Sequence, residues 1–220
     1  MYALLLATLC LLPVSISFAQ ADSAVPTGAS LEVYVKGQEA STPDVLRAIN
    51  RELDALMLPA GFRVVWRGAS EPLPANGAEH LVIVELRGIC TARFSSLASA
   101  PLSFPSALAS SSVADGKVLP FSWVDCTALN RFLAPVASTQ SPAEQDDLYG
   151  RSVARLLAHE FYHVLAQTDD HAAAGIAKAR FSTADLLADH FEFETSALER
   201  LRPPAAFASS DDASSSSGGR

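Results

Sequence analysis

The chain of 220 residues has few charges and contains no run of basic residues. Only 18% of its residues are charged, and 24 acidic against 16 basic residues give a net charge of −8. An acidic chain without a basic cluster lacks the electrostatic surface that nucleic acids and anionic lipids require. We therefore expect no nucleic-acid partner, whereas neutral or basic substrates remain possible.

Beyond its first residues the sequence lacks any apolar run long enough to cross a membrane. Residues 2–18 are mostly apolar and are followed by Ala-Gln-Ala at residues 19–21, which is the pattern of a secretory signal peptide and its cleavage site. Pro13 shortens this run below the length of a spanning helix. We predict a signal peptide at residues 1–21, a mature chain without a membrane span, and a secreted or periplasmic location.

Cysteine is also scarce, with Cys90 and Cys126 as the only thiols after the signal peptide. Neither has the closely spaced partner of a cysteine zinc site, which argues against a metal bound by these residues. In an exported protein two such thiols are expected to form a disulfide, because the compartment is oxidising. The alternative is two buried free thiols.

Hydrophobic periodicity predicts an α+β domain over residues 22–202. Strands are expected at residues 31–35, 62–67, 80–87 and 117–126, and helices at 43–57 and 143–166. Pro120 favours an edge position for the last strand, since proline cannot donate to a ladder. Residues 94–112 are rich in serine, alanine and proline and predict an irregular segment, and residues 203–220 predict a disordered tail.

The long predicted helix at 143–166 contains the pattern H-E-x-x-H as His159, Glu160 and His163. Residues four apart on a helix share one face, so both imidazoles can reach a single zinc ion. The intervening glutamate then lies beside the metal, where it can accept a proton from bound water. This motif predicts His159 and His163 as zinc ligands and Glu160 as the catalytic base.

On these residues the chain resembles the zincin metalloproteases, whose active-site helix lies over a mixed β-sheet. The resemblance implies a zincin-like sheet with packed helices, a Zn²⁺ cofactor and a peptide or protein substrate. Similarity to the metzincin branch is looser. Ala166 and Asp169 stand where a metzincin has glycine and its third ligand, and Met1 and Met57 are the only methionines, which leaves no Met-turn.

The third zinc ligand has several candidates in the sequence. His171 is favoured, because a loop of turn-forming residues after the helix could return an imidazole to the metal. Asp169 occupies the metzincin position and could instead be a ligand or a partner of a ligand histidine. A glutamate on a following helix, as in gluzincins, is the other arrangement. The further candidates are Glu192, Glu194 and His190.

The sequence favours a secreted zinc metallopeptidase that hydrolyses peptide bonds through a water activated by Glu160. A zinc hydrolase acting on a small amide or ester is a second possibility. A non-catalytic exported binding or structural domain is a third. Metal content separates the last from the other two.

Overall fold

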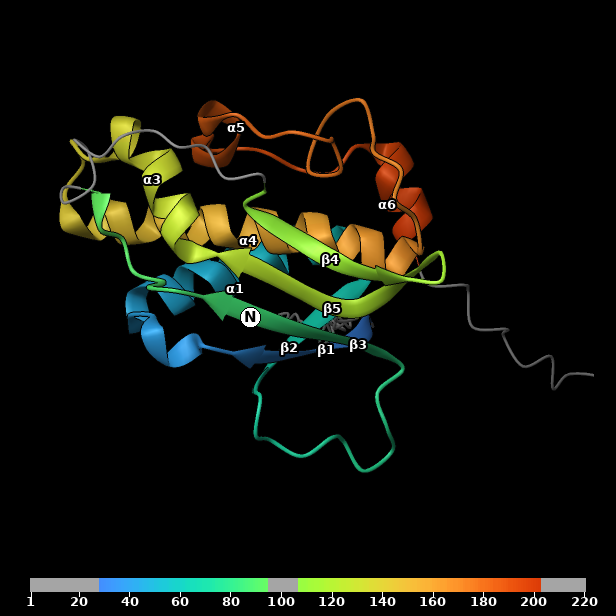
Figure 1. Ribbon diagram of the computed structural model, residues 1–220. Helices are drawn as coiled ribbons and strands as arrows, with labels where there is room; N and C mark the ends of the chain where they lie inside the picture. Colours follow the sequence, from blue (N-terminus) through green and yellow to red (C-terminus); the bar gives the residue numbers. More distant parts are fainter. Residues whose placement is uncertain (1–27, 95–106, 203–220) are drawn as a thin grey trace, which may run out of the picture.

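The computed structural model (Figure 1) describes residues 28–94 and 107–202 of the chain. The predicted signal peptide, the predicted tail and most of the serine- and proline-rich segment lie outside these residues. The described residues form an α+β fold with a five-stranded mixed sheet, as the sequence predicts. No helix in the described part of the chain has the length and apolar character needed to span a membrane.

The sheet has the strand order β2-β1-β3-β5-β4. Strands β2, β1, β3 and β5 run parallel, and β4 pairs antiparallel with β5 at the edge. The strands are β1 (Ala29–Lys36), β2 (Phe62–Gly68), β3 (His80–Arg87), β4 (Ala109–Ala114) and β5 (Lys117–Asp125). The helices are α1 (Pro43–Met57), α3 (Cys126–Ala137), α4 (Pro142–Ala166), α5 (Thr183–Leu187) and α6 (Thr195–Leu201), and short 3-10 turns lie at Gln38–Ala40 and Leu58–Ala60.

The prediction of an edge position for β5 is wrong, because β4 forms the edge instead. The sequence of β4, ASSSVA, is too polar to show a strand pattern, and it falls partly within the segment predicted to be irregular. Asp115 and Gly116 both have positive φ and form the turn that joins β4 to β5. Pro120 is tolerated because the β4 ladder shifts register opposite it and pairing with β3 begins only at Phe121.

Helices α1 and α4 lie together against one face of the sheet (Figure 1). Thr42 caps α1 and Ser141 caps α4, each by accepting a hydrogen bond from a backbone N–H in the first turn. Gly150 allows close contact between the two helices, since a Cβ there would lie 2.5 Å from the Cβ of Ala48. This packing buries most of α4 and holds its C-terminal half, which carries the H-E-x-x-H motif, in a fixed position.

The predicted disulfide between Cys90 and Cys126 is confirmed, with a Cα–Cα distance of 4.9 Å. It joins the segment after β3 to the first residue of α3, a helix that the sequence patterns did not reveal. Buried Asn130 of α3 reinforces this junction by donating to the carbonyls of Thr91 and Cys126. A helix was not expected here because the predicted strand ended at Cys126, and proline is present in the last turn of α3.

Candidate metal centre

Helix α4 presents His159 and His163 on the same face, one turn apart. The Nδ1 atom of His159 lies 2.8 Å from the carbonyl oxygen of Ile176, and that of His163 lies 2.8 Å from the carbonyl oxygen of Thr168. A carbonyl can only accept, so both Nδ1 atoms carry a proton. These bonds fix the orientation of both rings and assign Nε2 as the atom available to a metal.

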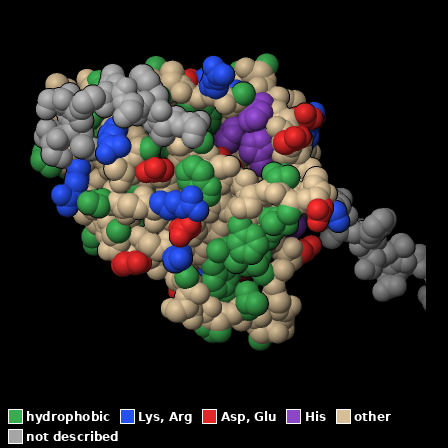
Figure 2. Space-filling model, viewed as in Figure 1, with side chains coloured by type: hydrophobic (Ala, Val, Ile, Leu, Met, Phe, Trp, Pro, Cys, Tyr) green, Lys and Arg blue, Asp and Glu red, His purple; other side chains and the backbone are tan. Residues whose placement is uncertain are grey.

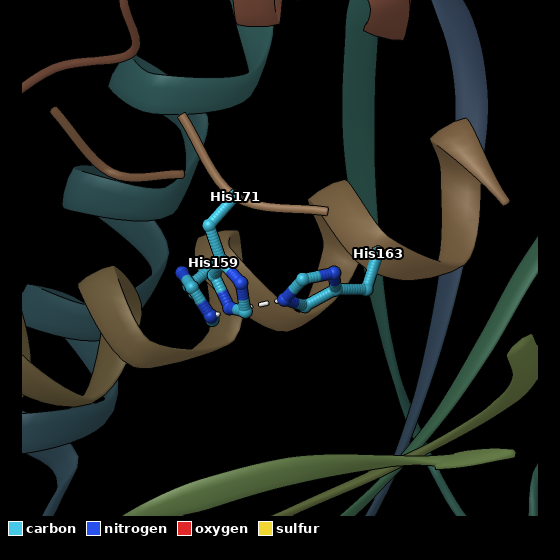
Figure 3. Close-up of side chains that lie close together, drawn as sticks. All are labelled: His159, His163 and His171. Carbon is cyan, nitrogen blue, oxygen red and sulfur yellow. Dashed lines mark hydrogen bonds between the residues drawn. The ribbon is translucent and has the colours of Figure 1, made fainter. Parts of the chain in front are cut away.

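The two Nε2 atoms converge and lie 3.1 Å apart (dashed line in Figure 3). Burial lowers the pKa of His159 to about 4, although its hydrogen bond to Ile176 opposes the shift, and burial also lowers the pKa of His163. Both rings are therefore neutral at pH 7, and neither has a proton on Nε2. The close contact consequently brings two lone pairs together, which is unfavourable unless a cation lies between them.

The loop after α4 brings His171 to the same place. Gln167 ends the helix in the left-handed conformation, and its side chain donates to the carbonyls of Val118 and Val164. The chain then reverses, and the ring of His171 stacks on that of His159 with 5.3 Å between centroids. The side chains of His159, His163 and His171 form a group in which the ligand atoms all lie within 4.8 Å of one another (Figure 3).

This donor set fits a zinc ion. A tetrahedral zinc with nitrogen ligands at 2.0–2.1 Å holds pairs of ligand atoms about 3.3 Å apart, which is close to the separation of the two Nε2 atoms on α4. Three neutral imidazoles are also a donor set that zinc favours and that leaves a fourth position open for water or substrate. The three histidines can therefore hold a metal ion of this kind.

Among the described residues, the other candidates for the third ligand do not belong to this group. Asp169 lines the cavity that contains the three histidines, and its charge raises the pKa of His163 in opposition to burial. His190 and Glu192 are exposed, and Glu194 is the residue preceding α6. Ala166 remains helical, because the chain reverses one residue later, and no glycine is needed there.

Glu160 is 4% exposed and lies on the floor of the cleft beside the histidines. Its Oε2 accepts a 2.7 Å hydrogen bond from the hydroxyl of Ser111 on β4, and that hydroxyl lies 2.9 Å from the hydroxyl of Ser122 on β5. Burial raises the pKa of Glu160 to about 7, and the hydrogen bonds from Ser111 partly oppose this. A carboxyl group with this pKa can exchange protons near neutral pH.

Ser111 and Gly175 contribute to the site although sequence patterns did not identify them. Gly175 has a φ of 68°, and a Cβ there would lie 2.4 Å from the carbonyl oxygen of Glu192. The next residue, Ile176, donates its N–H to that same carbonyl, and its own carbonyl accepts the hydrogen bond from the Nδ1–H of His159. Glycine at this position thus lets the loop hold the imidazole of His159, an arrangement that no local pattern predicts.

The histidines lie in a surface cleft formed by two adjoining cavities of about 390 and 290 Å³. Both cavities are lined by Ala109, His159, Glu160 and Ala179, so they form one groove between β4 and residues 178–181. Figure 2 shows the histidine side chains in this cleft, with basic side chains above them and acidic side chains to their right. The groove leaves the three histidines accessible from the surface.

Comparison of the chain with protein-family models, curated proteins and solved structures finds no match. Its function is therefore argued from the geometry of the site.

Replacing His171 with alanine should lower zinc affinity by at least about tenfold, because one of the three converging imidazoles is lost. Asp169→Ala is the matched control from the same loop, and we expect a smaller decrease because this carboxylate is outside the group of converging atoms. Competitive titration with a chromogenic chelator measures both affinities. Parental zinc affinity in His171→Ala, together with a large loss in Asp169→Ala, would show that the aspartate is the ligand.

Proposed function

We propose that this protein is an exported zinc metallopeptidase that hydrolyses peptide bonds, with His159, His163 and His171 as the zinc ligands. The observation that carries this proposal is the convergence of three histidines beside a buried glutamate in an accessible groove. The predicted signal peptide and the disulfide support a secreted or periplasmic location. The H-E-x-x-H motif on a buried helix beside a mixed sheet supports a relationship to the zincins.

Zinc bound by the three histidines would supply Lewis acidity, which polarises a substrate carbonyl and acidifies water. Glu160 accepts the proton of the attacking water and then delivers it to the nitrogen of the leaving amine. Ser111 orients this carboxylate through its hydrogen bond, so that the proton-accepting group does not rotate away from the cleft. The carbonyls of Ile176 and Thr168 keep the two helix imidazoles in position.

The groove suits an extended chain because β4 borders it and is the edge strand of the sheet. An edge strand has unpaired backbone groups on its outer side, with which a peptide can form hydrogen bonds. This feature favours a peptide over a small amide or ester as substrate.

The proposal is tested by measuring zinc in the purified mature protein and by digesting a broad peptide library. We expect one zinc per chain and cleavage that a metal chelator stops and added zinc restores. His163→Ala serves as the control, since it should remove both the metal and the cleavage. Absence of stoichiometric metal after reconstitution would exclude the enzyme, and bound zinc without hydrolysis of any peptide would favour a different substrate or a non-catalytic role.

A further inference from the structure

The larger of the two cavities has basic residues and apolar walls at one end of the groove. Lys178 and Arg180 both line it, beside His159 and Glu160. These two basic residues follow Gly175 and belong to the same loop that holds His159 in place. The cavity therefore places positive charge close to the group that would carry out the reaction.

The two basic residues differ in their partners. The ammonium group of Lys178 lies 2.7 Å from the carboxylate of Asp185 and 5.2 Å from the ring centre of Phe191. Its charge is thus already neutralised within the protein. Arg180 is exposed, and within residues 28–94 and 107–202 no carboxylate forms an ion pair with it. Arg180 is consequently the basic group of this cavity that can bind an external anion.

The walls of the cavity strengthen such an interaction. Leu108, Phe132, Leu156 and Phe181 contribute apolar side chains to them. A substrate that covers them displaces water, and an ion pair in less polar surroundings is screened less than one on the open surface. The planar guanidinium of arginine matches a carboxylate with two parallel hydrogen bonds.

The other cavity of the groove has an additional acidic residue on its wall. Asp169 lines it beside His163 and His171. An acidic side chain would be repelled from that carboxylate and attracted to Arg180. The charges therefore favour one placement of an acidic residue along the groove, at the end where Arg180 lies.

We propose that the enzyme prefers peptides with an acidic side chain beside the scissile bond, and that Arg180 binds the carboxylate of that side chain. This inference rests on the proposed peptidase function, and it makes Arg180 a specificity-determining residue of the site.

The experiment uses three acetylated and amidated pentapeptides with a central glutamate, glutamine or lysine between alanines. Their binding to the zinc-loaded Glu160→Gln protein is measured by titration at low ionic strength. The same titrations are made with two double variants, in which Glu160→Gln is combined with Arg180→Gln or with Arg180→Glu. We expect the glutamate peptide to bind about tenfold more tightly than the glutamine peptide. Arg180→Gln should remove this preference, and Arg180→Glu should shift it to the lysine peptide.

Arg47→Glu is the matched control, because it makes the same change in net charge on the exposed side of α1, away from both cavities. It should leave the preference for glutamate unchanged. The protein with Glu160 intact is then assayed for hydrolysis of the same peptides. In the digest of the broad peptide library, we expect acidic residues to be enriched at one position beside the cleaved bond.

Each other outcome decides the inference. Binding without preference, failure of all three peptides to bind, or a preference that survives Arg180→Gln would overturn it. An equal loss for all peptides in Arg180→Gln would also overturn it, since the arginine would then act on the peptide backbone. A glutamate preference in binding without hydrolysis would retain the role of Arg180 in binding an acidic side chain and would refute the peptidase. Hydrolysis of the peptides without a charge preference would retain the peptidase and overturn the role of Arg180.

Discussion

Replacing Glu160 with glutamine should leave zinc bound and abolish peptide hydrolysis. Glutamine has nearly the same shape and can still accept the hydrogen bond from Ser111, so the packing of the cleft should not change. An amide cannot take a proton from water, and loss of a positioned general base slows a reaction by about 10²–10⁴-fold. The group of three histidines remains intact, because Glu160 is not one of its members.

Three measurements check this expectation: zinc content, thermal unfolding temperature, and kcat/KM on a peptide cleaved by the parent protein. Ser111→Ala is a useful companion variant, since it keeps the carboxylate and removes the group that orients it. We expect Ser111→Ala to retain zinc and to lose activity to a smaller extent. Full hydrolytic activity in Glu160→Gln would assign the proton transfer to another group and contradict the mechanism.

Replacing Arg155 with methionine should destabilise the protein by about 3–5 kcal/mol, because it removes one partner of a buried ion pair. Arg155 lies on α4 with no exposed surface, and its Nε donates to the carboxylate of Glu52 on α1 at 2.7 Å. Its Nη1 donates to the backbone carbonyls of Asp185 and Leu186 in α5. The substitution would leave the partly buried carboxylate of Glu52 without its cation and would remove a donor from both carbonyls, of which that of Leu186 still accepts from the hydroxyl of Ser152.

Urea unfolding measures this effect, and Arg51→Met is the matched control. Arg51 also pairs with a carboxylate, that of Asp147, but its side chain is 61% exposed. The control should therefore change stability by less than about 1 kcal/mol. The double variant Glu52→Leu with Arg155→Met should recover much of the loss, since both buried charges are then absent. Equal effects of the two single arginine substitutions would show that the buried pair has no special role.

The elements with strong local patterns were predicted correctly from the sequence. Helix α1 has one apolar face with Thr42 and Pro43 at its start, and the first three strands have short apolar runs between turn residues. Such signals depend on neighbouring residues along the chain, so no tertiary information is needed to read them. The same holds for the His159–His163 pair, because helical geometry alone places residues four apart on one face.

Other features depended on contacts between distant segments. The order of β4 and β5 could not be predicted, because a polar strand such as β4 forms only when a neighbouring strand offers its backbone groups. The hydrogen bond between Ser111 and Glu160 joins an edge strand to a helix 49 residues later. A serine in a serine-rich segment gives no signal of such a role.

The sequence by itself determined the α+β class, the pairing of Cys90 with Cys126, and the two histidines and glutamate of the α4 motif. Only the tertiary structure decided which of the candidate residues joins that histidine pair. The sequence favoured His171 but left Asp169 open, because both follow the helix within one short loop. The reversal at Gln167 and the carbonyl of Ile176 then orient the loop and the His159 ring so that an imidazole, and not a carboxylate, completes the converging group.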